Sequence, residues 1–271
     1  MFKKVVIADS LAPMVDAIFS THTEQSGGTL ALGAILFAFQ IYGDFSGYSD
    51  IAIGTAKLFG IELMSNFKFP YFSRDIAEFW RRWHISLSTW FRDYLYIPLG
   101  GSKGGKWRSL RNIFVIFIVS GFWHGANLTF LVWGGIHSLM YVPIFLFGTN
   151  RKYLHEIAGQ HKWFPKAGEF AAILVTFALV TLAWIFFRAE SLSHSFSYIN
   201  GIFTNFSTVI EYKRGIIYCA ILVFLEWMLK EDERLRQPWL NGWPGRIFFG
   251  ILIIFIIEKF GGYNQFIYFQ F

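Results

Sequence analysis

The apolar run over residues 113–147 limits the folds open to this chain more than any other stretch. As a single helix it would be about 52 Å long, whereas the hydrocarbon core of a bilayer is about 30 Å thick. The run is too long for one crossing and too short for two full ones. Glycines on both sides of Trp123 and His124 would let the backbone turn there. We therefore expect two helices that meet at a break near His124.

The composition agrees with a membrane protein. Of the 271 residues, 54% are hydrophobic and 15% are charged, whereas about a quarter of the residues of a soluble domain are charged. The alternative is a soluble enzyme with a very large core, and the length of the apolar runs argues against it. We expect an all-α, polytopic bundle in which broken or re-entrant helices and interfacial helices surround a polar cavity.

The net charge of +6 would suggest a nucleic-acid partner for a soluble domain. Here Lys and Arg gather in loops between apolar runs, as the positive-inside bias predicts. We therefore expect lipid, and no nucleic acid, as a partner. We also expect no metal, because Cys219 is the only cysteine and neither His155 nor His161 has metal-ligand spacing to a Cys, Asp or Glu.

Several further segments are expected to form the scaffold. The absence of an internal repeat argues against a secondary transporter. We interpret residues 5–19 as an amphipathic interfacial helix or a kinked membrane segment. We predict a plain membrane span at residues 170–187, an interfacial helix at 191–206, further spans at 216–229 and 247–257, and an interfacial aromatic tail at 261–271.

A polar segment, GDFSGYSD at residues 43–50, interrupts the apolar run of residues 29–59. The whole run would be about 45 Å long as one helix, which exceeds the hydrocarbon core. We therefore expect a broken helix or a tight pair of helices there. Polar groups at membrane depth are tolerated only where they face protein or a watery cavity. Asp44 thus belongs either to the wall of a site or to an ordinary interfacial loop.

Residues 74–96 carry charged and aromatic side chains in equal measure, which fits a lipid-facing span poorly. We predict one interfacial or partly buried helix over this range, capped by Ser73. Arg74 with Glu78, and Glu78 with Arg82, have the four-residue spacing of helical ion pairs.

Helical spacing along the same segment places Trp80, His84, Ser88 and Arg92 on one stripe. One interpretation is a site to which the helix presents a histidine, a hydroxyl and a guanidinium. The other is a juxtamembrane helix whose arginines contact lipid phosphates. A lipid anchor has no need of His84, and an ionisable group at membrane depth is a functional hypothesis by default.

The loop at residues 98–108 is rich in glycine and lysine. Its glycines lack the spacing and the strand context of a phosphate-binding loop. Its positive charge predicts a cytoplasmic position. Contact with the phosphates of a cytosolic donor and membrane topology alone both account for that charge.

His124 and His137 follow one another across the predicted break. Broken helices are where transporters and membrane enzymes build their sites, so a Trp-His-Gly sequence flanked by helix breakers favours function over a core histidine. His137 is expected either to be a partner behind the site or to be structural.

Two stretches, RRWHISLSTWFRDYLYIPLGG and SGFWHGANLTFLVWGG, are long and specific enough to compare with a known protein family. With YGDFSGYSDIAIG they make the chain resemble the membrane-bound O-acyltransferase family, most closely its bacterial branch for alginate and peptidoglycan O-acetylation. The resemblance covers nearly all of the chain. Family members carry further helices before the segment that begins at Met1, so residues 1–271 are expected to be a single membrane domain, the C-terminal portion of that fold.

The resemblance implies that His124 is the catalytic histidine and that His84 is the second polar residue of the site. One departure is Leu128, where the bacterial pattern usually has Trp, beside the expected acyl group. We also expect substrate or donor contacts from Trp80, Arg81, Arg82, Ser88, Arg92, Trp123, Asn127 and Asp44.

The resemblance also implies a reaction and its setting. We expect transfer of an acetyl group from acetyl-CoA or another cytosolic thioester to an extracytoplasmic polysaccharide (alginate, peptidoglycan or another exopolysaccharide), with no tightly bound cofactor. Implied partners are an extracytoplasmic acetyltransferase of the SGNH type and an acyl carrier protein, at the inner membrane. The alternatives are D-alanyl transfer to teichoic acid and a non-catalytic channel or scaffold that conducts the acyl group.

Overall fold

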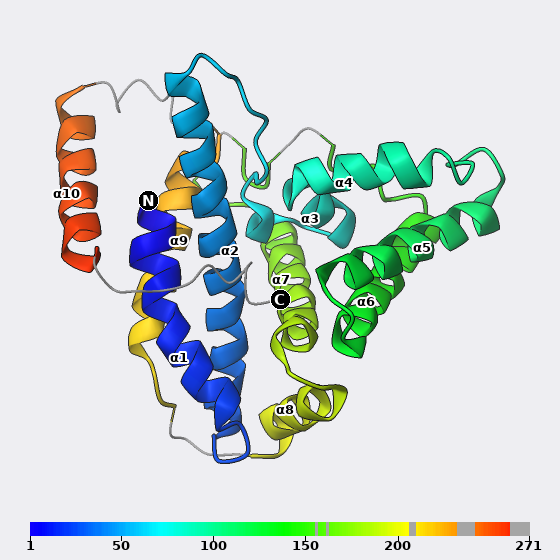
Figure 1. Ribbon diagram of the computed structural model, residues 1–271, viewed down its shortest axis with the longest axis horizontal. Helices are drawn as coiled ribbons and strands as arrows, with labels where there is room; N and C mark the ends of the chain where they lie inside the picture. Colours follow the sequence, from blue (N-terminus) through cyan, green and yellow to red (C-terminus); the bar gives the residue numbers. More distant parts are fainter. Residues whose placement is uncertain (155–156, 161–162, 206–209, 232–241, 261–271) are drawn as a thin grey trace. The chain divides into compact units, whose positions relative to one another are not determined.

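A computed structural model of the chain describes residues 1–154, 157–160, 163–205, 210–231 and 242–260 (Figure 1). These residues form helices and loops and contain no β-strand, which confirms the all-α prediction. The expectations for His155, His161 and the aromatic tail lie outside the described residues. The chain divides into two compact units: the first comprises Met1–Ser65 and Ser197–Phe271, and the second comprises Asn66–Phe196.

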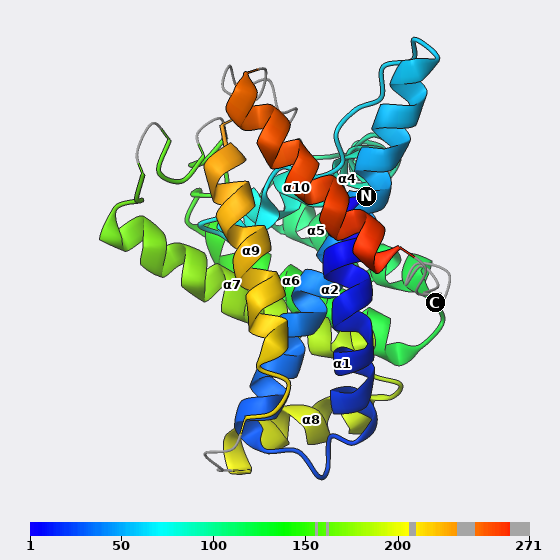
Figure 2. The same ribbon diagram turned by 90° about the vertical axis from the view of Figure 1, so that its left-hand side faces the viewer.

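The first unit is built around one long helix, α2, which packs against the two N-terminal helices η1 and α1 (Figure 1). α9 contacts η1, α1 and α2, and α10 packs across the start of the chain on η1 (Figure 2). The bounds are η1 Phe2–Ala8, α1 Asp9–Ser20, α2 Gly27–Leu58, α9 Arg214–Leu229 and α10 Trp243–Lys259.

The predicted break at residues 43–50 is wrong, because α2 is continuous over 32 residues. The two glycines of residues 43–50 allow close packing instead of a turn. A Cβ on Gly43 would lie 2.9 Å from the carbonyl oxygen of Lys3, and one on Gly47 would lie 2.7 Å from the amide nitrogen of Lys4. The two acidic groups of the polar segment are paired within the unit: Lys4 Nζ lies 2.6 Å from Asp44 Oδ1, and Lys3 Nζ lies 3.2 Å from Asp50 Oδ2.

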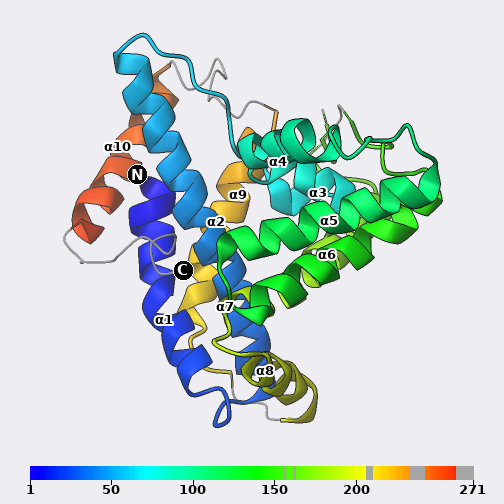
Figure 3. The same cartoon turned by 45° about the vertical axis from the view of Figure 1, so that its right-hand side comes forward.

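The second unit holds both Trp-His pairs. α5 and α6 lie side by side (Figure 3), α6 also contacts α3 and α7, and η2 contacts α7. α8, Leu192–Thr204, begins in this unit and ends in the first. The bounds are η2 Pro70–Phe72, α3 Ile76–Arg82, α4 Ile85–Phe91, η3 Arg92–Tyr96, α5 Lys106–His124, α6 Leu128–Leu146 and α7 Ala167–Arg188.

Three helices in the described part of the chain have the length and apolarity to cross a membrane: α2, α6 and α7. α7 confirms the helix expected at residues 170–187. Helices also form at the two later predicted spans, but α9 and α10 have only 16 and 17 residues, so their crossing of the membrane stays a prediction.

The break between α5 and α6 is confirmed. α5 ends at His124, and the side chain of Asn127 caps α6 by accepting a hydrogen bond from the amide of Thr129 at 3.1 Å. The two helices approach closely because a Cβ on Gly121 would overlap the carbonyl of Phe130. Small residues of this kind let membrane helices come together.

The predicted single helix at residues 74–96 is wrong, because the segment divides into α3, α4 and η3. At the division His84 adopts the left-handed conformation, with φ 43° and ψ 56°. The loop before α3 holds the start of α4: Asn66 accepts hydrogen bonds from the amides of Ile85 at 3.0 Å and Ser86 at 3.1 Å. A tertiary contact of this kind leaves no trace in helical periodicity.

The cap of α3 also differs from the prediction. Asp75, and not Ser73, accepts the hydrogen bond from the amide of Glu78, at 2.7 Å. Its carboxylate thus stands at the positive end of the helix, where a negative charge is stabilising.

Candidate active site

His84 occupies the hinge between α3 and α4. Its positive φ is uncommon for a residue other than glycine, and such strained residues cluster at functional sites. The side chain is half-buried. Burial lowers the pKa of His84 to about 4, so the imidazole is neutral at physiological pH.

His124 ends α5 and lies among aromatic rings of the next two helices. Its ring centroid is 5.4 Å from that of Trp133 on α6 and 4.9 Å from that of Phe187 on α7, both with edge-to-face geometry. Phe130 lies 6.3 Å away. These contacts fix the plane of a half-buried imidazole.

The structure brings His84 and His124 to the same place, although they are far apart in sequence. Both rings flank Trp123, with centroid distances of 6.4 Å from His84 and 5.0 Å from His124. After burial, the nearness of His84 is the second cause that lowers the pKa of His124. Their catalytic roles stay a prediction, but the shared location that the mechanism needs is present.

Trp80 and His137 form a contact between α3 and α6. The indole Nε1 of Trp80 donates a hydrogen bond to Nδ1 of His137 at 3.3 Å. His137 is fully buried, and its ring lies 4.9 Å from that of Trp133, which in turn contacts His124. The ring of Trp133 thus links His137 to His124, and the role of His137, as a partner of the site or as a structural residue, stays a prediction.

The predicted ion pairs of α3 are confirmed and are buried. Glu78 accepts from Arg74 Nη2 at 3.0 Å and from Arg82 Nη2 at 2.7 Å. Arg81 donates to the main-chain carbonyls of Asn150 at 2.9 Å and Tyr153 at 3.1 Å. Arg81 and Arg82 are thus engaged in the scaffold, which favours a structural role for them over contact with donor phosphates.

Arg92 differs from the other arginines because it is exposed. Its Nε donates to Asp93 at 2.7 Å. This hydrogen bond is the main reason that the pKa of Arg92 is raised. The guanidinium therefore stays charged and accessible. Of the three arginines predicted to contact phosphate, Arg92 makes the fewest contacts with the rest of the fold.

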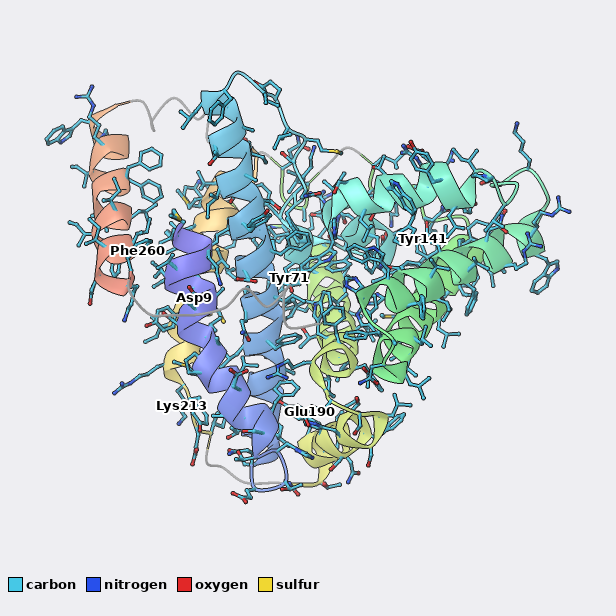
Figure 4. The ribbon with its side chains drawn as sticks, viewed as in Figure 1. Asp9, Tyr71, Tyr141, Glu190, Lys213 and Phe260 are labelled. Atoms are coloured by element: carbon cyan, nitrogen blue, oxygen red, sulfur yellow. The ribbon has the colours of Figure 1, made fainter. Side chains whose placement is uncertain are left out.

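Ser88 and Asn127 stabilise the two breaks. Ser88 Oγ donates to the carbonyls of Trp80 and Trp83, each at 3.4 Å, across the hinge of α3 and α4. Asn127 Nδ2 donates at 2.8 Å to the carbonyl of Glu190, which is labelled in Figure 4 in the turn between α7 and α8. Their expected contacts with substrate stay predictions.

The remaining predicted residues fall in two places. Trp123 is exposed between the two histidines, and Leu128 is exposed on the first turn of α6. Asp44 belongs to the first unit, where it pairs with Lys4. Its expected contact with substrate stays a prediction.

Sequence reasoning missed the aromatic residues that surround the histidines. Trp184 and Phe187 lie on α7, which the sequence indicated only as a plain span. Trp133 stacks on Trp184 at 5.6 Å. The cluster continues to Tyr71, labelled in Figure 4, whose ring lies 6.3 Å from that of Phe79. The three- and four-residue spacings of Trp184 with Phe187 and of Trp133 with His137 were the available signal.

The described residues contain no group of three or more His, Cys, Asp or Glu side chains that would hold a metal ion. The expected absence of a metal stays a prediction. Cys219 is a buried free thiol on α9 in the first unit.

An all-helical membrane protein with two histidines at helix breaks is the class that this fold and this site define. Within that class the chain belongs to the membrane-bound O-acyltransferase (MBOAT) family, whose sequence model matches residues 1–148 and so includes His84 and His124.

Three relatives illustrate the similarity. The chain is 42% identical over 97% of its length to a probable alginate O-acetylase of Pseudomonas aeruginosa, and covers 44% of that protein. It is 33% identical over its whole length to a peptidoglycan O-acetyltransferase of Helicobacter pylori, covering 55%. It is 32% identical over 64% of its length to a teichoic acid D-alanyltransferase of Bacillus subtilis, covering 44%. The chain thus spans about half the length of these relatives.

Proposed function

We propose that this chain is part of an O-acetyltransferase that moves an acetyl group from a cytosolic thioester, such as acetyl-CoA, to an extracytoplasmic polysaccharide. The observation that carries the proposal is the convergence of His84 and His124 on Trp123 at two helix breaks. Family membership and the similarity to proteins named for alginate and peptidoglycan O-acetylation support it.

His124 acts as the general base. A nitrogen of its neutral imidazole accepts the proton of the acceptor hydroxyl as the hydroxyl oxygen bonds to the acyl carbon. The carbon–sulfur bond then breaks, and the thiolate leaves and takes up that proton to become a thiol. A positioned base of this kind contributes typically about 10²–10⁴-fold to the rate.

His84 assists at the acyl group. Because its imidazole is neutral, it carries one N–H, which it donates to the oxygen of the thioester as negative charge develops there, or which orients the donor. A protonated His84 would repel the proton that His124 must accept, so the depressed pKa of His84 suits a site that works with two neutral rings.

Family membership supports the proposed setting. The protein spans the inner membrane several times, with α2, α6 and α7 as crossings, and passes the acetyl group to an SGNH-type transferase outside. An acyl carrier protein is the alternative donor. The similarity to D-alanyltransferases makes D-alanyl transfer to teichoic acid the second candidate, and the lower identity makes it the weaker one.

The test is His124→Ala in the complete gene product, with polysaccharide acetylation and the membrane level of the protein both measured. The expected result is loss of acetylation at a normal level of protein. His22→Ala in the loop before α2 is the matched control and should retain full activity. Retained acetylation in His124→Ala would leave only a channel or scaffold role.

A further inference from the structure

Three buried ring nitrogens belong to one aromatic cluster of α6 and α7. They are Nε1 of Trp133, Nε2 of His137 and Nε1 of Trp184, and none has a hydrogen-bond partner among the residues that the structure describes. These side chains are only 1%, 0% and 1% exposed, respectively. Leaving a buried polar group unpaired is costly, so three in one place need an explanation.

The hydrogen bond from Trp80 determines which ring nitrogen of His137 carries the proton. Trp80 donates to Nδ1 of His137, so Nδ1 is an acceptor and the proton of the neutral ring lies on Nε2. An indole nitrogen is a donor only. All three unpaired groups are therefore donors, and together they select an acceptor.

The three donors belong to one cluster. The ring centroids of Trp133 and His137 are 4.9 Å apart, those of Trp133 and Trp184 are 5.6 Å apart, and those of His137 and Trp184 are 6.4 Å apart. The three rings thus form one packed cluster that carries three unpaired donors.

The surroundings indicate which acceptor would bind. The flanking rings of Phe117 and Phe187 are apolar, lying 6.1 Å from His137 and 5.2 Å from Trp184. A neutral oxygen attached to a short apolar group suits N–H donors in such a place better than an anion does, because no cationic side chain belongs to the cluster as described. Trp133 also contacts His124, at 5.4 Å.

We propose that Trp133, His137 and Trp184 bind the carbonyl oxygen of the acyl group on which His124 acts. This inference rests on the proposed function and adds to it the subsite for the acyl carbonyl. The same three donors would also hold a buried water molecule, whose oxygen has the same acceptor chemistry. The experiment must therefore distinguish an acyl carbonyl oxygen from the oxygen of a water molecule.

A matched pair of substitutions separates the two nitrogens of His137. In His137→Gln the side-chain amide can place an N–H near the position of Nε2, whereas in His137→Asn the side-chain oxygen can replace Nδ1 as the acceptor for Trp80. If the subsite binds the acyl carbonyl, His137→Gln should retain at least about tenfold more activity than His137→Asn, since one donor to a developing oxyanion is worth up to about 10²–10³-fold. A role limited to anchoring Trp80 predicts the reverse order.

The indole donors are tested by Trp133→Phe and Trp184→Phe, which keep an aromatic ring and remove the N–H. Acetyl transfer from acetyl-CoA is measured in membranes that contain the complete gene product. The turnover number should fall about tenfold or more in each variant, with a smaller change in KM. Trp107→Phe is the control, because Trp107 is 82% exposed, and its activity should be unchanged.

Infrared spectroscopy distinguishes an acyl carbonyl from a water molecule. With carbonyl-¹³C acetyl-CoA bound, the C=O stretch should lie at lower frequency in the wild type than in solution, and the shift should shrink in Trp184→Phe. An unshifted band, or full activity of the two tryptophan variants, would mean a water or an empty subsite and would overturn the inference while the proposed function stands. A wild type that transfers no acetyl group would overturn both.

Discussion

At the scale of single residues, His84 combines a strained backbone with a position in the candidate active site. A left-handed conformation costs an ordinary L-residue about 1–2 kcal/mol, and glycine avoids the penalty. The hydrogen bonds of Asn66 to the first amides of α4 hold His84 in this conformation. The fold thus contains a local conformational free-energy cost at His84, whose ring contacts that of Trp123.

The penalty can be measured with His84→Gly and His84→Ala. Both variants lose the imidazole, so both should lose most of the activity. His84→Gly should nevertheless be more stable to unfolding than His84→Ala by about 1 kcal/mol, because only alanine has a Cβ to strain at positive φ. Thermal unfolding in detergent checks this. Equal stability would mean that the hinge relaxes when the imidazole is removed.

The pKa of His84 also predicts a dependence of stability on pH. The folded-state pKa is about 4, below the ordinary value of 6.5. As the pH falls from 6.5 towards 4, the unfolded chain binds a proton at His84 that the folded chain does not, so stability is lost across this window. The difference in melting temperature between pH 7 and pH 5 should be larger for the wild type than for His84→Gln. An identical difference would show that His84 is equally solvated in both states.

At the scale of elements, glycine has two structural roles in this chain: it allows a helix break at one place and a close helix contact at another. Gly125 lies in the break between α5 and α6, and that break was predicted correctly. Gly43 and Gly47 lie inside a continuous helix, where they admit η1, and the predicted break was wrong. The local sequence is similar in both cases. The difference lies in which helix packs against the backbone at the glycines. A single sequence does not predict that tertiary contact.

Helical periodicity likewise predicted the ion pairs of Glu78 but not the hinge at His84. The pairs are local and follow from four-residue spacing. The hinge depends on Asn66, which lies far from it along the chain. The aromatic surroundings of His124 were missed for the same reason, since Phe187 comes from another helix.

The contact of α5 with α6 gives a prediction with an internal control. A Cβ on Gly134 would overlap the carbonyl of Phe117, whereas one on Gly135 would come no closer than 3.9 Å, to Cδ1 of Ile118. Gly134→Ala should therefore destabilise the protein by about 1–3 kcal/mol. Gly135→Ala should be neutral or slightly stabilising, because alanine favours helix. Thermal unfolding of the two variants is the measurement, and equal effects would contradict the close packing.

At the scale of the whole molecule, the fold class and the membrane character followed from the sequence. The apolar composition and the long runs predicted an all-α membrane protein, and α2, α6 and α7 have the required length and apolarity. The three helices differ in their surroundings. Within its 18-residue apolar window α2 is 78% buried by protein, compared with 33% for α6. Hydropathy alone does not separate a helix wrapped by protein from one with a lipid face.

The orientation in the membrane is predicted from the basic loop before α5. Lysines there favour the cytoplasmic side. A cysteine introduced as Lys103→Cys should therefore react with a membrane-impermeant maleimide only after the cytoplasmic face is opened. The natural Cys219 is buried and should stay unlabelled in the folded protein, which makes it the internal control. Labelling of Lys103→Cys in intact cells would reverse the assigned orientation.

The edge-to-face contacts of His124 with Trp133 and Phe187 bear on its proposed role as the general base. A surface imidazole samples several rotamers and must be ordered anew for each reactant that arrives. Here three helices have already restricted that freedom during folding, so little entropy remains to be lost at each turnover. In the proposed mechanism, His124 is therefore already ordered for proton transfer before either substrate binds.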